Sequence, residues 1–163
     1  MKKKLFLDTN VFIDYLGSRK DYAAASMIIS LAQKGYFSLL VSSLSFATAS
    51  YILNAHHKKS NEEIVAMFAA FVKKCNVTPV DSVIIDKAIA SEFKDFEDAM
   101  QYYSALREGA DAIITRNIVD LWYGYQVWEL LLDDFPNKYP NDSVMIGTKT
   151  SFISSILPLS PQI

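Results

Sequence analysis

Polar side chains that can do acid–base, metal-binding or phosphate-binding chemistry follow two short apolar runs of this sequence. The first run is residues 5–7, and the second begins at Ala112. In an open parallel sheet, ligands bind beyond the carboxyl ends of the strands, so residues that directly follow a strand are candidates for a site. The candidates are Asp8, Thr9 and Asn10 after the first run, and Thr115, Arg116, Asn117 and the nearby Asp120 after the second.

A third segment, between these two in sequence, carries carboxylates at the start of a predicted helix. Asp95 and Asp98 are three residues apart, and residues at that spacing share a helix face. Carboxylates that converge on one spot repel each other unless a cation lies between them, and hard oxygen ligands suit Mg²⁺ or Mn²⁺. Such an ion can lower the pKa of a bound water and stabilise the charge of a reacting phosphodiester.

Each of these acids also has an ordinary structural explanation. Asp8 can form a turn or cap the short helix that follows it, and the sequence leaves both interpretations open. For Asp95 and Asp120, taken alone, a role as helix cap is favoured. Asp98 stands where the acid of a capping box would stand, and its role is also open. We expect Glu97 to be solvated.

Length and composition exclude several classes of protein. With 163 residues, 51% of them hydrophobic and 21% charged, the chain fits one globular domain and excludes a disordered or disulfide-rich scaffold. Its net charge of −2 means that any contact with nucleic acid must be local, because there is no global basic field. A single cysteine, Cys75, excludes an internal disulfide and fits a reducing cytoplasm.

One long stretch without Asp, Glu, Lys or Arg, residues 35–57, raises the question of a membrane span. The stretch contains nine Ser, Thr, Asn and His residues, which is too polar for a span of about 20 residues. The lysines at positions 2–4 resemble the start of a signal peptide, but Asp8 interrupts the apolar run after three residues. We therefore expect a soluble, cytoplasmic protein that does not enter a membrane.

Short apolar runs alternate with amphipathic segments along the first 115 residues. Ser60 and Glu63 have the spacing of a capping box at the start of one of these segments. This alternation predicts βαβ units and a three-layer α/β/α fold with a mostly parallel, Rossmann-like sheet. The predicted strands are residues 5–7, 36–41, 77–80 and 112–115; the predicted helices are 21–34, 43–54, 60–75, 81–91 and 95–107.

The C-terminal part of the chain has a different pattern. Apolar side chains recur at helical spacing from Leu121 to Phe135, and this stripe is more typical of a core or a dimer interface than of a cofactor site. The stripe ends at Pro136, and an uncharged tail begins at Ser151. We assign residues 1–163 to a single domain.

Three motifs, taken together, resemble the PIN-domain family, and VapC-like toxin nucleases are the most similar group. They are Asp-Thr-Asn-Val-Phe-Ile-Asp from Asp8, Asp-Phe-Glu-Asp-Ala-Met-Gln from Asp95 and Asp-Ala-Ile-Ile-Thr-Arg-Asn from Asp111. The resemblance implies a Rossmann-like sheet and a Mg²⁺- or Mn²⁺-dependent acidic site that cuts single-stranded RNA, leaving a 5′-phosphate and a 3′-hydroxyl. It also implies a homodimer and a small antitoxin protein as partner.

Carried over position by position, the motifs of the family place its first acid on Asp8 and its helix acid on Asp98. The acid expected after Thr-Arg falls on Asn117, and Asp120 is the nearby substitute. The acid expected on the helix after the second strand should lie within residues 43–50, where no carboxylate exists.

Two further points follow from the same resemblance. Within residues 43–50, Ser45 or Thr48 offers only a neutral oxygen. Relatives commonly end soon after Thr-Arg-Asn with a short strand and a Ser-Pro turn, a pattern found here at residues 155–161. We therefore interpret residues 118–148 as an inserted segment.

These features lead to two main hypotheses. In the first, the chain is a metal-dependent ribonuclease, with Asp8, Asp98 and Asp120 as metal ligands assisted by Asn117. The residues expected to orient water or phosphate are Thr9, Asn10, Thr115 and Arg116. In the second, the missing acids make it a catalytically degenerate module that binds RNA or a protein. A phosphatase of the haloacid dehalogenase type is more distant, because it requires Asp-x-Asp where this chain has Asn10.

Overall fold

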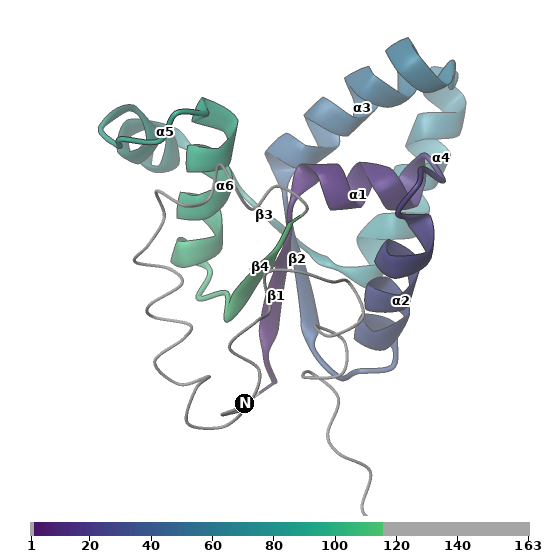
Figure 1. The fold of residues 1–163 in the computed structure, drawn as a ribbon, viewed down its shortest axis with the longest axis horizontal. Coiled ribbons are helices and arrows are strands. Elements are labelled where there is room, and N and C mark those ends of the chain that lie inside the picture. Colours follow the sequence, from purple (N-terminus) through teal and green to yellow (C-terminus); the bar gives the residue numbers. More distant parts are fainter. Residues whose placement is uncertain (1, 116–163) are drawn as a thin grey trace, which may run out of the picture.

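One parallel sheet organises the part of the chain that the computed structural model describes, residues 2–115 (Figure 1). The strands are β1 (Lys4–Leu7), β2 (Ser38–Ser42), β3 (Asn76–Thr78) and β4 (Ala112–Ile114), in the order β3-β2-β1-β4. All three pairings are parallel, and Phe6 of β1 lies between Leu40 of β2 and Ile113 of β4. The parallel sheet predicted from the alternating pattern is therefore confirmed.

Helices cover both faces of this sheet. In order, they are α1 (Thr9–Leu16), α2 (Tyr22–Gln33), α3 (Ser43–His57), α4 (Asn61–Phe71), the short 3-10 helix η1 (Val72–Lys74), α5 (Ser82–Ile89) and α6 (Phe96–Arg107). Figure 1 shows α1 to α4 on one side of the sheet and α5 with α6 on the other. This arrangement confirms the predicted three-layer α/β/α architecture.

Element boundaries differ from the predicted ones by a few residues. Ser42 ends β2 and also caps α3, because its hydroxyl oxygen accepts a hydrogen bond from the N–H of Ser45 at 3.1 Å. Helix α3 continues to His57, beyond the predicted end at Asn54. It ends where Lys58 adopts a left-handed conformation, with φ of 53°.

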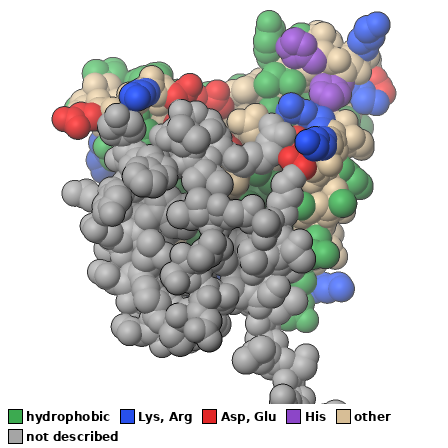
Figure 2. Space-filling model, in the orientation of Figure 1, with side chains coloured by type: hydrophobic (Ala, Val, Ile, Leu, Met, Phe, Trp, Pro, Cys, Tyr) green, Lys and Arg blue, Asp and Glu red, His purple; other side chains and the backbone are tan. Residues whose placement is uncertain are grey.

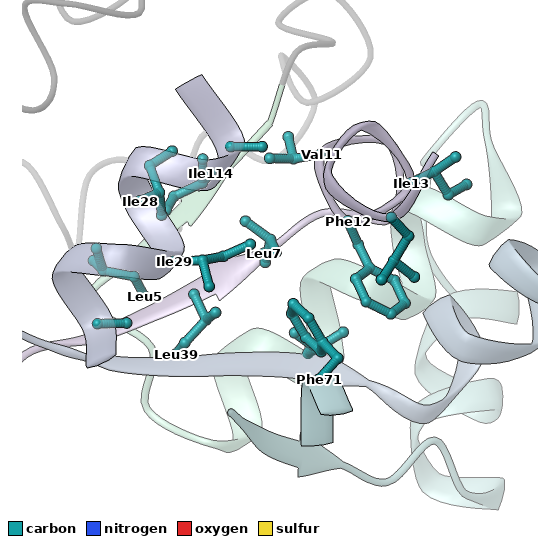
Figure 3. Packing of buried hydrophobic residues seen from close by; sticks show 14 of the residues in the cluster. Leu5, Leu7, Val11, Phe12, Ile13, Ile28, Ile29, Leu39, Phe71 and Ile114 are labelled. Atoms are coloured by element: carbon teal, nitrogen blue, oxygen red, sulfur yellow. The ribbon is translucent and has the colours of Figure 1, made fainter. Parts of the chain in front are cut away.

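The central apolar side chains of β1, β2 and β4 are buried on both faces of the sheet, as their continuously apolar runs predict, whereas β3 at the edge is partly exposed. Leu5 and Leu7 of β1 point to the side of α1 and α2, where they pack in one cluster with Phe12 and Ile29 (Figure 3). Phe6 points to the other side and packs in a second cluster with Tyr102 of α6. The alternation of side chains along β1 thus ties both helical layers to the strand that precedes Asp8.

Aromatic rings join α1 to α3 and α4. The ring of Phe12 lies 4.9 Å from that of Phe46 and 4.6 Å from that of Phe71, measured between centroids. Phe46 in turn meets Phe68 edge-on at 5.0 Å. Aromatic pairs at these separations stabilise a core beyond the area they bury. They fix α3 beside the start of α1, where the candidate site begins.

Within residues 2–115, no helix has the length and apolar character needed to cross a membrane. Most of the uncharged stretch 35–57 is divided between β2, which begins at Ser38, and α3, which ends at His57.

The capping box of α4 offers a measurement of stability that leaves the sheet untouched. The Ser60 hydroxyl accepts from the N–H of Glu63 at 3.2 Å, and the Glu63 carboxylate accepts from the N–H of Ser60 at 2.8 Å. We expect Ser60→Ala to lower the free energy of unfolding by about 1 kcal/mol, since it removes one half of the box. Chemical denaturation measures this change, and an unchanged midpoint would contradict the assignment. Ser60→Asp, which retains a capping oxygen, is the matched control.

Candidate functional site

The two segments predicted to meet at the sheet edge lie side by side. From β1 the chain adds β2 and then β3 on one side of the sheet, and it later adds β4 on the other side of β1. The switch point is therefore between β1 and β4, and open α/β sheets bind ligands at such a point. Asp8 follows β1 and Thr115 follows β4. The Thr115 hydroxyl donates to the Asp8 carboxylate at 2.9 Å, and the Asp8 N–H donates to the Ile114 carbonyl at 2.9 Å. Both segments therefore belong to one place in the fold.

Asp8 is a buried acid, with 7% of its surface exposed. Among the described residues, its side chain makes no capping hydrogen bond to α1, although it stands at the N-cap position. Burial raises the pKa of its carboxyl, and the negative charge of Glu97 acts in the same direction; the hydrogen bond from Thr115 and the nearby N–H groups of Thr9 and Asn10 oppose this. The fold thus keeps a carboxylate where its negative charge is costly, and a cation beside it would relieve that cost.

The first turn of α6 presents the other predicted acids. Asp95 is the helix cap, since its carboxylate accepts from the N–H of Asp98 at 3.1 Å. The interpretation of Asp95 as a cap is therefore confirmed. Asp98 and Glu97 follow in the same turn, and both side chains are half-buried. Figure 2 shows acidic side chains along the upper edge of the molecule in this region.

Glu97 was expected to be solvated; it is half-buried and its carboxylate also contacts α3. The Thr48 hydroxyl donates to its carboxylate at 3.4 Å, across 49 residues of sequence. An acid in the first turn of a helix is favourable because it interacts with the positive end of the helix dipole. This local explanation requires no contact with another element, so the sequence pattern suggested an exposed side chain. Only the contact between α6 and α3 at the edge of the sheet shows that this carboxylate also meets a second helix.

A neutral network of four buried side chains lies beneath these acids. Gln101 of α6 donates from its amide nitrogen to Thr9 at 2.5 Å and to Ser45 at 3.0 Å, and its amide oxygen accepts from Ser42 at 2.7 Å. The Ser45 hydroxyl is also bonded to Thr9 at 2.9 Å and to Ser42 at 3.0 Å. Each of the four residues is at most 4% exposed.

This network ties α6 to the ends of β1 and β2. Gln101 is three residues after Asp98 and four after Glu97, so it lies one turn further along the same side of the helix. Because it holds Thr9, it fixes the acidic turn relative to the neighbouring Asp8. Our sequence analysis missed Gln101; the signal available was a polar residue at helical spacing from two acids, surrounded by small and apolar positions.

The remaining predicted site residues are those expected to bind substrate or to complete the metal site. Thr9, predicted to bind substrate, has its hydroxyl engaged in the network, whereas Asn10 is half-buried in the first turn of α1. Three of the predicted site residues, Arg116, Asn117 and Asp120, lie outside the described residues, as does the predicted insertion 118–148.

A hard divalent cation fits this donor set. Within residues 2–115, no three His, Cys, Asp or Glu side chains are gathered closely enough to hold an ion by themselves. Mg²⁺, however, usually binds through one or two carboxylates and takes its other ligands from water and substrate phosphate. The buried Asp8 carboxylate, with the acids of the α6 turn nearby, has the chemistry of such a partial site.

Comparison with known proteins gives a consistent picture along most of the chain. The family model described as PIN domain matches residues 4–119. Among curated proteins, Ribonuclease VapC1 of Aquifex aeolicus (strain VF5) is 31% identical over 145 residues. That match covers 84% of this chain and 96% of the ribonuclease.

Two solved structures are similar in fold. The crystal structure of VapC20 from Mycobacterium tuberculosis, a sarcin–ricin loop cleaving toxin, superposes with a TM-score of 0.57 at 14% identity, covering 75% of this chain and 94% of VapC20. VapBC2 of Rickettsia felis, solved with a DNA fragment from its promoter, gives a TM-score of 0.53 at 16% identity, covering 72% and 90%. At these identities the likeness concerns the arrangement of strands and helices.

Proposed function

The chain belongs to the PIN-domain family, and on this premise we propose that it is a metal-dependent endoribonuclease that hydrolyses phosphodiester bonds of RNA. The family resemblance first inferred from the three acidic motifs is confirmed. The observation that carries the proposal is the buried Asp8 carboxylate at the switch point, with an acidic helix turn held beside it. A relative that covers most of the chain, Ribonuclease VapC1, supports the reaction.

In this proposal, Asp8 and Asp98 hold Mg²⁺ or Mn²⁺, with Asp120 and Asn117 completing the site. When bound, the ion supplies Lewis acidity for the attacking water and offsets the charge on phosphate. The Thr115 hydroxyl keeps the Asp8 carboxylate oriented, because it donates to one carboxylate oxygen. Arg116 pairs with a substrate phosphate, as a guanidinium suits.

Asn10 and Thr9 complete the proposed residue set. Asn10 orients water or phosphate from the first turn of α1. Thr9 acts from below, since its hydroxyl is bonded to Ser45 and Gln101 and holds the substrate-facing residues in place. Neither the family match nor Ribonuclease VapC1 supports the alternative of a degenerate binding module.

Basic side chains gathered at one end of α3 suit local contacts with RNA phosphate despite the net charge of −2, although Lys59 among them also pairs with Glu63. Figure 2 shows both histidines of the chain, His56 and His57, at the far end of α3, with Lys and Arg side chains around them. Phosphate contacts from such groups position nucleic acid without reading its sequence.

We further propose that the chain is the toxin of a toxin–antitoxin pair. On this view it acts in the cytoplasm as a homodimer and is held inactive by a small antitoxin protein. The similarity in fold to VapC20 and VapBC2 supports this assignment. A small reading frame beside the gene, whose product co-purifies with this chain and suppresses RNA cleavage, is the expected finding; a product that neither binds nor inhibits would contradict it.

Substitution of Asp98 tests the catalytic assignment. We expect the wild type to cleave single-stranded RNA with Mg²⁺ or Mn²⁺ and to lose cleavage in EDTA. Asp98→Asn should lower the cleavage rate on the order of a hundredfold, because the site loses a charged ligand. Asp95→Asn is the matched control: it removes a charge from the same turn but keeps a capping oxygen, so cleavage should persist. Equal rates for wild type and Asp98→Asn would refute the assignment of Asp98.

A further inference from the structure

Helix α3 presents a hydroxyl where the family resemblance expects a carboxylate. Residues 43–50 contain no acid. Two side chains of this segment contact α6: Ser45 meets Gln101, and Thr48 meets Glu97. The Thr48 hydroxyl donates to Glu97 at 3.4 Å. Of these two contacts, the one at Thr48 brings a carboxylate, that of Glu97, to the segment of α3 that lacks an acid.

We propose that Glu97 is a further metal-binding residue of this site, which supplies from α6 the carboxylate that α3 lacks. This inference rests on the proposed function and deepens it. It also explains how a chain without an acid on α3 can retain a charged site.

The hydrogen bonds of Gln101 place the side of α6 that carries Glu97 at the sheet edge. Glu97 and Gln101 are four residues apart on α6, so they share one side of the helix. Gln101 is bonded to Thr9, the neighbour of Asp8, and to Ser45, three residues before Thr48 on α3. The side of α6 that carries Glu97 is thus the side that faces the ends of β1 and β2, where Asp8 lies.

Burial and charge agree with this placement. Glu97 is half-buried, and its negative charge acts on the buried Asp8 carboxyl. Two carboxylates that repel each other, one of them buried, favour a divalent cation between them. A Glu side chain is also one methylene longer than Asp, so Glu97 can leave the Thr48 hydroxyl and turn toward an ion.

Charge removal at Glu97 gives the first test. Glu97→Gln keeps the size of the side chain and an oxygen that can accept from Thr48, but it removes the negative charge. We expect Mn²⁺ binding to the full chain, measured by titration calorimetry and by the electron paramagnetic resonance of free Mn²⁺, to weaken on the order of 10- to 100-fold. Glu92→Gln, an exposed acid ahead of the same helix, is the matched control and should bind Mn²⁺ as the wild type does.

Moving the carboxylate back to α3 gives the second test. In the double variant Thr48→Glu with Glu97→Gln, the carboxylate is carried by α3 instead of α6, at the residue that contacts position 97. We expect Mn²⁺ affinity and RNA cleavage to recover most of what Glu97→Gln loses. A role for Glu97 limited to the start of α6 predicts no such recovery, because the added acid lies on a different helix.

The outcomes separate this inference from the proposed function. The role of Glu97 would be overturned if Glu97→Gln bound Mn²⁺ as tightly as the wild type, or if the double variant bound Mn²⁺ no more tightly than Glu97→Gln. Neither result would affect the proposed function, provided that the wild type cleaves RNA. A wild-type chain that neither binds Mn²⁺ nor cleaves RNA would instead overturn the proposed function. Weakened binding together with recovery in the double variant supports the inference.

Discussion

Asp8→Asn is expected to abolish RNA cleavage and, at neutral pH, to raise the free energy of unfolding. Cleavage should fall on the order of a thousandfold or more, a loss of about 4 kcal/mol of transition-state stabilisation. The reason is that Asp8 is the buried acid at the switch point, joined to Thr115 of the neighbouring segment. A neutral amide of the same shape keeps an oxygen for Thr115 but removes the charge that a cation needs.

The gain in stability follows from the direction of the pKa shift. Burial raises the pKa of Asp8 in the folded chain above its ordinary value of 3.8. The folded chain therefore binds this proton more tightly than the unfolded chain does, and the stability that results is present below pH 3.8. It is lost as the pH rises through the folded pKa, because the carboxyl then carries a buried charge. The Asn variant has no such charge at any pH.

Chemical denaturation of both proteins in EDTA, from pH 4 to pH 8, measures this effect. The variant should be the more stable protein at pH 8, and the difference should shrink as the pH falls toward 4. Asp86→Asn, an exposed acid of α5, is the matched control and should show no gain of this kind. A variant that is less stable than the wild type at pH 8 would show that the Asp8 charge is well compensated in the metal-free protein.

Much of this arrangement could be predicted from short-range patterns. Asp8 and Thr115 were expected at one edge because the carboxyl ends of parallel strands meet there, and the hydrogen bond between them agrees. Ser60 and Glu63 were expected to form a capping box, which depends only on neighbours along the chain, and they do. Asp95 was expected to be a cap for the same reason.

The contacts between α3 and α6 could not be predicted in this way. Thr48 and Glu97 meet because both helices pack beside the ends of β1 and β2, and no local pattern contains that information. Glu97 looked like an ordinary first-turn acid, and Gln101 looked like a single polar residue on a helix. Their roles depend on the order of strands in the sheet and on tertiary packing. The predictions for Asn117 and Asp120 lie outside the described residues.

Gln101→Leu is expected to cause the largest loss of stability among these substitutions, about 2–4 kcal/mol. The amide of Gln101 bonds three hydroxyl side chains, those of Thr9, Ser42 and Ser45, all of them buried. Each buried polar group left without a partner costs about 1–3 kcal/mol, and partial repair among the remaining hydroxyls offsets some of that cost. The loss should exceed the loss of about 1 kcal/mol expected for Ser60→Ala.

A double-mutant cycle between Gln101→Leu and Ser42→Ala tests whether these groups act as one network. If they do, the second substitution should cost much less in the presence of the first, since the hydroxyl that it removes has already lost its partner. Additive losses in chemical denaturation would mean that the two side chains contribute independently. Such a result would contradict the network.

The same substitution should also separate positioning from folding. Gln101 does not reach the reacting atoms in our proposal, but it holds α6 against Thr9 and so fixes the acidic turn beside Asp8. At a temperature where both variants remain folded, Gln101→Leu should weaken Mn²⁺ binding on the order of tenfold, as expected when a supporting contact of a metal site is lost, whereas Ser60→Ala should not. If both variants bind Mn²⁺ like the wild type, the network stabilises the fold without setting the geometry of the site. A selective loss in Gln101→Leu would mean that the position of the acids depends on a buried amide rather than on the acids themselves.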